Sequence, residues 1–153
     1  MDIYVEFQEL LKSLNAHKAN YAVCGGFAVA FHGYVRATKD IDLLVQRSDI
    51  DSLVAIAAEL GFDPCDDFLR FGIGTDRETS IKRLNKFVAT DFLTLDLIVV
   101  NSQTEIAWTT RLEVALPDQN MQVVSLHGLA AMKRLAGRTQ DLLDLEKLGL
   151  NDK

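Results

Sequence analysis

The chain has 153 residues, of which 48% are hydrophobic, and its formal net charge is −6. This length suits one ordinary domain, and the hydrophobic fraction is high enough to bury a core without disulfides. No window approaches the ~18 uninterrupted apolar residues that span a bilayer, and the acidic N-terminus is unlike a signal peptide. The acidity disfavours broad binding to phosphate backbones, which depends on many Lys and Arg residues. We therefore expect one cytoplasmic domain over residues 1–153, with no membrane contact.

Hydrophobic periodicity predicts helices and strands mixed along the whole chain. Apolar residues at helical spacing predict an N-terminal amphipathic helix over residues 2–16, and capping and glycine signals mark the later helices. One strand–helix–strand unit followed by hairpins indicates an α/β or α+β fold with a mixed sheet. The expected elements after the first helix are a strand at 20–26, a helix at 27–32, a strand at 40–45, a helix at 49–60 capped by Ser48 and Asp51, strands at 80–88 and 93–100, a helix at 102–108 capped by Ser102, a hairpin of 111–116 with 121–124, and helices at 125–136 and 139–148.

Two aspartates lie in the otherwise apolar strand "DIDLLV". Residues two apart in a strand point to one side, so Asp40 and Asp42 present both carboxylates to the same face. Like charges this close repel unless a cation lies between them, and Mg²⁺ favours one or two carboxylates together with substrate phosphates. Asp96 in "TLDLIV" would complete a triad if its strand lies beside the first. Taken alone, the pair could instead be a solvated strand edge or a capping device, and Asp96 could be balanced by a neighbouring Lys.

The glycine pair at residues 25–26 lies between a predicted strand and a predicted helix. Such glycines let a backbone approach a phosphate closely, and the helix N-terminus adds free N–H groups and a favourable dipole. A Gly-Gly pair also marks ordinary turns. Glycines at one strand end, paired acids on the next strand and a third acid on a later strand together indicate a two-metal phosphoryl-transfer site.

The segments "GG" at 25–26, "DIDL" at 40–43 and "LDL" at 95–97 resemble the signature of the nucleotidyltransferase superfamily of DNA polymerase beta type. The run "GGFAVAFHGYVRATKDIDL" is most similar to small bacterial members, including abortive-infection type toxins and lincosamide-type antibiotic nucleotidyltransferases. The ending "VVSLHGLAAMKRLAGRTQDLLDLEKL" is similar to the helical segment that follows the sheet in such proteins. The resemblance implies a polymerase-beta-like core with a mixed, antiparallel-containing sheet, here at about 20–124, and a C-terminal helical segment at 125–148.

The resemblance also implies a reaction and the residues that perform it. An acceptor hydroxyl attacks the α-phosphorus of an NTP in line, and pyrophosphate leaves. Three acids would hold Mg²⁺ in a two-ion site, and Asp96 would act as the base for the hydroxyl or align it. The implied metal-binding and catalytic residues are Asp40, Asp42 and Asp96, and the implied nucleotide-binding residues are Gly25, Gly26, Arg36, Thr38 and Lys133.

The sequence does not identify the acceptor or the partners. The acceptor could be a small molecule, a protein or tRNA, and the acidity of the chain favours the first two. Few residues follow Asp96, so acceptor binding is expected to rely on a homodimer or on a partner protein. The alternative is a non-catalytic module that binds a partner, for example one half of a toxin–antitoxin pair, although all three acids are present. A dinucleotide-binding oxidoreductase is excluded, because no G-x-G-x-x-G follows the first strand.

The last predicted helix carries two further aspartates. Asp141 and Asp144 fall on one helical face, and we expect the leucine stripe of residues 142, 145 and 148 to lie opposite them. An ion pair from Arg138 to Asp141 is favoured there over a further metal site.

Overall fold

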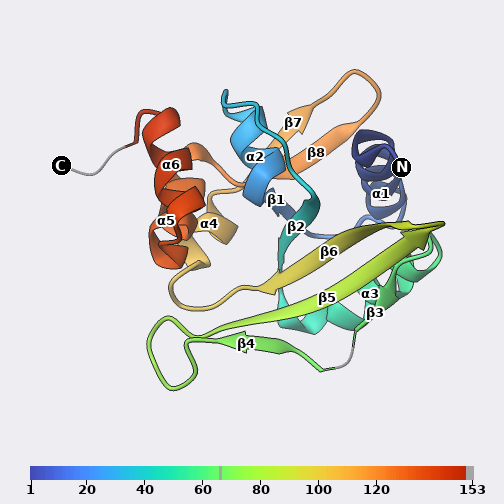
Figure 1. Cartoon of the computed structure of the whole chain (residues 1–153), viewed down its shortest axis with the longest axis horizontal. Helices are drawn as coiled ribbons and strands as arrows, with labels where there is room; N and C mark the ends of the chain where they lie inside the picture. Colours follow the sequence, from blue (N-terminus) through green and yellow to red (C-terminus); the bar gives the residue numbers. More distant parts are fainter. Residues whose placement is uncertain (66, 151–153) are drawn as a thin grey trace.

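A computed structural model describes residues 1–65 and 67–150 of the chain, and it shows helices packed around one mixed sheet (Figure 1). The predicted mixed α/β architecture is confirmed. The helices are α1 (Ile3–Ala16), α2 (Gly25–Phe31), α3 (Ile50–Ala58), α4 (Glu105–Thr109), α5 (Leu126–Ala136) and α6 (Thr139–Lys147). The strands are β1 (Ala22–Cys24), β2 (Asp40–Val45), β3 (Asp63–Pro64), β4 (Leu69–Phe71), β5 (Thr79–Val88), β6 (Asp91–Val99), β7 (Leu112–Ala115) and β8 (Asn120–Val123).

The sheet follows the strand order β3-β5-β6-β2-β1-β8-β7, and β4 pairs with β5 outside this path. Strand β2 is antiparallel to β1 and parallel to β6, whereas β5 and β6 form a long antiparallel hairpin. Apolar residues run almost without interruption through β2 and β6, as expected for strands near the middle of a sheet. The strands that carry Asp40, Asp42 and Asp96 are therefore direct neighbours in the middle of the sheet.

The helices form two groups around the sheet (Figure 1). Helix α1 packs on α3, which lies behind β5 in this view, and α5 packs on both α4 and α6. The buried face of α1 is the predicted one, formed by Phe7, Leu10, Leu11 and Leu14. None of the helices within the described residues combines the length and the apolar character that crossing a membrane requires.

Two predicted helix caps are wrong. Before α3 the chain makes a short 3₁₀ turn, and the N-cap residue is Asp49, whose side chain makes no capping hydrogen bond. Before α4 the N-cap residue is Thr104 instead of Ser102, again without a capping hydrogen bond from its side chain, and Asn101 Oδ1 accepts from the backbone N–H groups of Gln103 and Thr104 in the turn that precedes the helix. Ser and Thr both occur as N-cap residues, so residue type did not decide between the polar positions of this segment.

The predicted orientation of the last helix is only partly right: Leu145 of the expected apolar stripe is buried, but both aspartates are buried beside it. Asp141 and Asp144 are 1% and 0% exposed, whereas Leu142 on the expected apolar stripe is 55% exposed. Buried carboxylates are tolerated only when they are paired and hydrogen-bonded. Helix α6 satisfies this condition through cations of α5 and of the loop before β2, a set of contacts that helical periodicity does not reveal.

Candidate functional site

The strand register brings the acidic residues of β2 and β6 together. Asp42 lies directly opposite Asp96 in the parallel pair, and Asp40 lies opposite Thr94. Asp40 is exposed and Asp96 is buried. Since residues at i and i+2 of a strand share a face, the three carboxylates lie on one face of the sheet. Asp40 is the most exposed of them and Asp96 the most buried.

The acids of β2 are poorly balanced by positive charge. Burial, followed by the charges of Asp96 and Asp40, raises the pKa of Asp42 to about 7. Burial and the charge of Asp96 also raise the pKa of Asp40. Lys133 and Arg138 act on Asp42 in the opposite direction without outweighing these effects. The site therefore retains a repulsion that an added cation would relieve.

The glycine pair lies directly against the acid site. Gly25 has φ +62°, and a Cβ atom there would collide with the carboxylate of Asp42. A Cβ atom on Gly26 would lie 2.6 Å from Thr38 Oγ1 and 3.4 Å from a guanidinium nitrogen of Arg36. Glycine is required at both positions because Asp42, Thr38 and Arg36 pack directly against them, in addition to any role of the glycines towards a phosphate.

Arg83 is a site residue that the sequence analysis missed. It lies opposite Asp96 in the β5–β6 hairpin, and its guanidinium donates to both carboxylate oxygens, Nε to Oδ1 at 2.8 Å and Nη2 to Oδ2 at 2.9 Å. These hydrogen bonds raise the pKa of Arg83. The signal was present in the sequence, because pairing the two strands around the turn at residues 89–90 sets residue 83 against residue 96.

The predicted cations Arg36 and Lys133 converge on the carboxylate of Asp144. Arg36 donates to it from Nε and Nη2, both at 2.8 Å, and Lys133 Nζ lies 3.0 Å from it and 3.0 Å from Asp141. Burial pushes the pKa of each aspartate upward, but the hydrogen bonds from these cations, and from Arg138 to Asp141, outweigh it and lower both pKa values. Both cations are thus held in place by α6.

The donor set fits a divalent metal in its chemistry. Carboxylate oxygens are the ligands that Mg²⁺ prefers, and the raised pKa of Asp42 marks charge that an ion would neutralise. Within residues 1–65 and 67–150, however, no three His, Cys, Asp or Glu side chains are gathered as a ready metal cluster. Asp40 and Asp42 supply carboxylate oxygens for such an ion, while Asp96 is engaged by Arg83.

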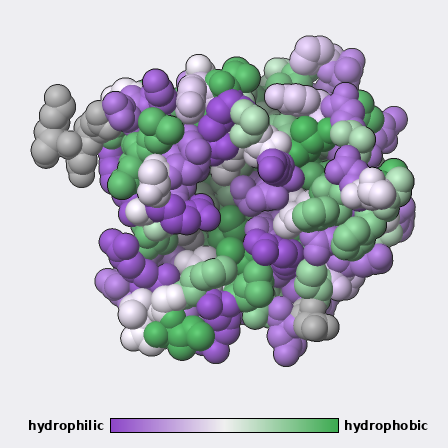
Figure 2. Space-filling view, in the orientation of Figure 1, coloured by the Kyte–Doolittle hydropathy of each residue, from purple (hydrophilic) through white to green (hydrophobic). Residues whose placement is uncertain are grey.

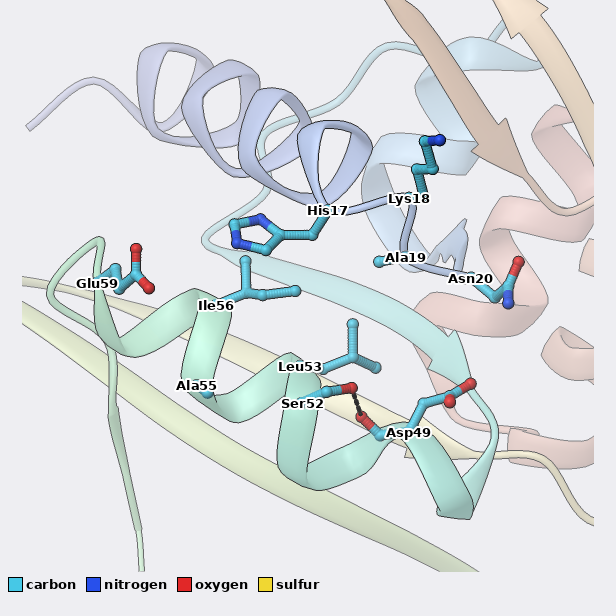
Figure 3. A pocket seen from close by; sticks show the side chains of 10 residues that line it. All are labelled: His17, Lys18, Ala19, Asn20, Asp49, Ser52, Leu53, Ala55, Ile56 and Glu59. Carbon is cyan, nitrogen blue, oxygen red and sulfur yellow. Dashed lines mark hydrogen bonds between the residues drawn. The ribbon is translucent and has the colours of Figure 1, made fainter.

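The surface around these elements is hollowed. The space-filling view shows a depression between the helices α5 and α6 and the strands β5 and β6, with hydrophilic residues around its rim (Figure 2). A separate hollow of about 390 Å³ lies between the end of α1 and α3, where the His17 ring lies over Ile56 (Figure 3). None of the predicted site residues lines that second hollow.

A protein-family model described as nucleotidyl transferase AbiEii toxin of type IV toxin–antitoxin systems matches residues 9–149. No curated protein gives a significant match. Three solved structures share the fold: a Thermotoga maritima protein assigned as a nucleotidyltransferase (13% identity, TM-score 0.65, 95% of this chain and 91% of the other covered), ANT(2″)-Ia in complex with adenylyl-2″-tobramycin (12%, 0.63, 94% and 86%), and the lincomycin-bound lincosamide antibiotic adenylyltransferase LnuA (14%, 0.59, 95% and 96%). At these identities the structural likeness shows the fold alone. The family match spans nearly the whole chain, and this protein is therefore a nucleotidyltransferase enzyme that belongs to the AbiEii toxin family.

Proposed function

We propose that the chain transfers an NMP from an NTP to a hydroxyl of an acceptor in an Mg²⁺-dependent reaction that releases pyrophosphate. Family membership supports the transferase class. The observation that carries the finer proposal is the position of Asp42 directly opposite Asp96, with its pKa raised to about 7. A carboxylate in this state, beside the start of a helix that begins with two glycines, suits a metal-bound triphosphate.

The three acids divide the chemistry between them. Asp40, Asp42 and Asp96 would hold Mg²⁺, which when bound neutralises phosphate charge and stabilises the attacking and leaving oxygens. Asp96 would accept the proton of the acceptor hydroxyl, or align that hydroxyl, as its oxygen forms a bond to the α-phosphorus. The bond from the α-phosphorus to the bridging oxygen breaks, and the electron pair leaves with pyrophosphate.

The triphosphate would lie along the start of α2. Gly25 and Gly26 carry no side chains there, and Asp42 packs against Gly25 and Thr38 against Gly26. Arg36 and Lys133 supply positive charge from a fixed position, since Asp144 holds both side chains. The charge of Lys133 lowers the pKa of Asp42, which shows that its field reaches the acids. We assign Gly25, Gly26, Arg36, Thr38 and Lys133 to nucleotide binding on this basis.

The acceptor is proposed to be a small molecule or a protein. The chain has a net charge of −6, and the cations near the site are already paired with aspartates, so little free positive charge is left for a long polynucleotide. ATP is the first donor to test, because two of the structural neighbours are named for adenylyl transfer or its product. The family description further supports a functional antitoxin counterpart.

A thermal-shift titration tests the nucleotide site. The wild type, Asp42→Asn and the matched control Asp51→Asn, an exposed carboxylate on α3, are each titrated with every NTP with and without Mg²⁺. We expect the wild type and the control to gain stability only when metal and nucleotide are both present, by about 2.7 kcal/mol at a hundredfold excess over Kd. Asp42→Asn should show a much weaker shift.

Transfer itself is measured with the stabilising NTP carrying an α-phosphate label and by release of pyrophosphate. Asp42→Asn should lose transfer while its fold is unchanged or slightly more stable, because the substitution removes repulsion between acids. Full activity in this variant would overturn the metal assignment. Absence of any nucleotide-dependent shift in the wild type would favour the non-catalytic partner-binding module instead.

A further inference from the structure

The ion pair between Arg83 and Asp96 occupies the carboxylate that the proposed reaction needs. Both oxygens of Asp96 accept from the guanidinium, at 2.8 and 2.9 Å, in the fork geometry that makes such pairs strong. The Asp96 side chain is 8% exposed, while that of Arg83 is 39% exposed. Asp96 is therefore fixed in the interior, and Arg83 reaches it from a more exposed position on the neighbouring strand β5.

The ion pair with Arg83 offsets repulsion among the acids of the site. Asp96 lies directly opposite Asp42, and its charge contributes to raising the pKa values of both Asp42 and Asp40. Without a cation, three carboxylates on one face would repel each other. Arg83 supplies positive charge at the most buried of the three, and its charge also lowers the pKa of Asp40. It thereby acts on the same carboxylates that a metal ion would neutralise.

We propose that Arg83 is a resident counter-cation that holds Asp96 in the metal-free enzyme and is displaced from it when a divalent metal binds. The inference rests on the proposed function, since it assumes that Asp96 is a metal ligand. Mg²⁺ and a forked guanidinium compete for the same two oxygens, and Mg²⁺ requires strict ligand geometry. Entry of the metal therefore requires Arg83 to withdraw. Because Arg83 is partly exposed, it can swing outward without unfolding β5.

Once displaced from Asp96, the guanidinium of Arg83 is available for a second interaction. In the proposed function a negatively charged nucleotide binds beside these acids, so pairing of the released guanidinium with that nucleotide would compensate for the lost ion pair. The metal alone must break the pair without this compensation. Arg83 is thus a positioning residue that makes the site bind metal weakly by itself and more strongly together with its substrate.

A purely structural ion pair predicts the opposite effect of removing Arg83. If the guanidinium only shaped the site, its loss would loosen Asp96 and weaken metal binding. If it competes with the metal, its loss strengthens metal binding even though the metal-free protein becomes less stable. The direction of the change in metal affinity separates the two roles.

The test uses Mn²⁺ alone as the probe, with free ion measured by electron paramagnetic resonance. The proteins are the wild type, Arg83→Met, and the matched control Arg70→Met, which removes an arginine paired with the surface residue Glu78. We expect Arg83→Met to bind Mn²⁺ about tenfold more tightly than the wild type or more, the order expected for losing a competing charge-assisted hydrogen bond. Arg70→Met should bind as the wild type does.

Equal or weaker Mn²⁺ binding by Arg83→Met, with binding by the wild type intact, overturns the inference and leaves the proposed function standing. Binding by neither protein overturns the inference, and the thermal-shift titration with nucleotide and Mg²⁺ then decides separately whether the proposed function stands. Circular dichroism verifies that Arg83→Met is folded. If it is not, Arg83→Lys replaces it, since lysine keeps a point charge but lacks the fork. Its Mn²⁺ affinity should then exceed that of the wild type, and an affinity equal to or below that of the wild type overturns the inference.

Discussion

Two groups of aspartates in this chain differ in how their charge is balanced. On α6, Asp141 and Asp144 are almost fully buried, yet Lys133 and Arg36 surround them and their pKa values are lowered. On β2, burial and neighbouring acids raise the pKa of Asp42 to about 7. Burial penalises the charged form in both groups, so the sign of the shift depends on the partners that the fold supplies.

The comparison separates structural carboxylates from candidate ligands. A carboxylate whose charge is matched by cations of its own chain has no need of an added ion, and its substitution disturbs the fold. A carboxylate left among like charges is destabilising unless something from outside binds to it. The α6 aspartates belong to the first kind and Asp42 to the second. Each prediction below tests one side of this division.

The largest expected effect is on stability. Asp144 is 0% exposed and accepts from Arg36, Lys133 and Gln140. Asp144→Asn should lower the free energy of unfolding by about 3–5 kcal/mol, because it leaves buried cations without their counter-charge. Urea denaturation measures this loss. Glu146→Gln, an exposed position on the same helix, is the control and should change stability by less than about 0.5 kcal/mol. Similar small losses of stability in both variants would contradict the assignment of Asp144 as a structural carboxylate.

The next effect concerns the contact between α2 and the acid site. Gly25→Ala should destabilise the fold by about 1–3 kcal/mol through its positive φ, and by more through collision with Asp42. Gly137→Ala is a matched control, since Gly137 has the same φ of +62° and its Cβ would meet only Arg134 O at 3.6 Å. The difference in unfolding free energy between the two variants isolates the collision. Equal losses would show that Asp42 yields easily and is not held against α2.

The order of the main elements could be predicted from sequence, because hydrophobic period and glycine breaks mark them directly. The short strands β3 and β4 could not be predicted, since two and three residues carry no period, and they pair only because β5 extends beside them. The caps before α3 and α4 failed for a different reason. Several polar residues in a row can each cap a helix, and the backbone path decides between them.

The site was only partly predictable. Asp40, Asp42 and the glycines form a local pattern, and Asp96 was found as an acid in an apolar strand. The partners of these residues come from distant segments: Arg83 through the hairpin register, and Asp144 from a helix that lies more than a hundred positions beyond Arg36. Sequence spacing reports neither the register nor the docking of α6. Helical period consequently placed Leu142 inside, where the structure places two paired aspartates.

The two groups should respond to pH in opposite ways. The folded-state pKa of Asp42, about 7, is above the unfolded value of 3.8, so between these values the native state still holds a proton that the unfolded state has already released, and stability falls as pH rises. In metal-free buffer the wild type should lose stability relative to Asp42→Asn from about pH 4 to pH 7, and the gap should then stay constant. For Asp144, whose pKa is lowered, the advantage of the wild type over Asp144→Asn should shrink as pH falls below 3.8. Unfolding free energies measured from below pH 3.8 to above pH 7 give both gaps, and a flat Asp42 gap would contradict the first expectation.

The smallest effect on the free energy of unfolding is expected for Arg138, the exposed partner of Asp141. Arg138 donates to Asp141 at 2.7 Å, but its side chain is 77% exposed, whereas Lys133, the other partner of Asp141, is buried. Exposed ion pairs contribute little, so Arg138→Gln should lower the free energy of unfolding by less than about 1 kcal/mol, and by less still at high salt. A loss as large as that of Asp144→Asn would mean that Lys133 alone does not balance Asp141. The exposed guanidinium would then belong to the structural network, and removing it would also deprive Asp42 of a charge that lowers its pKa.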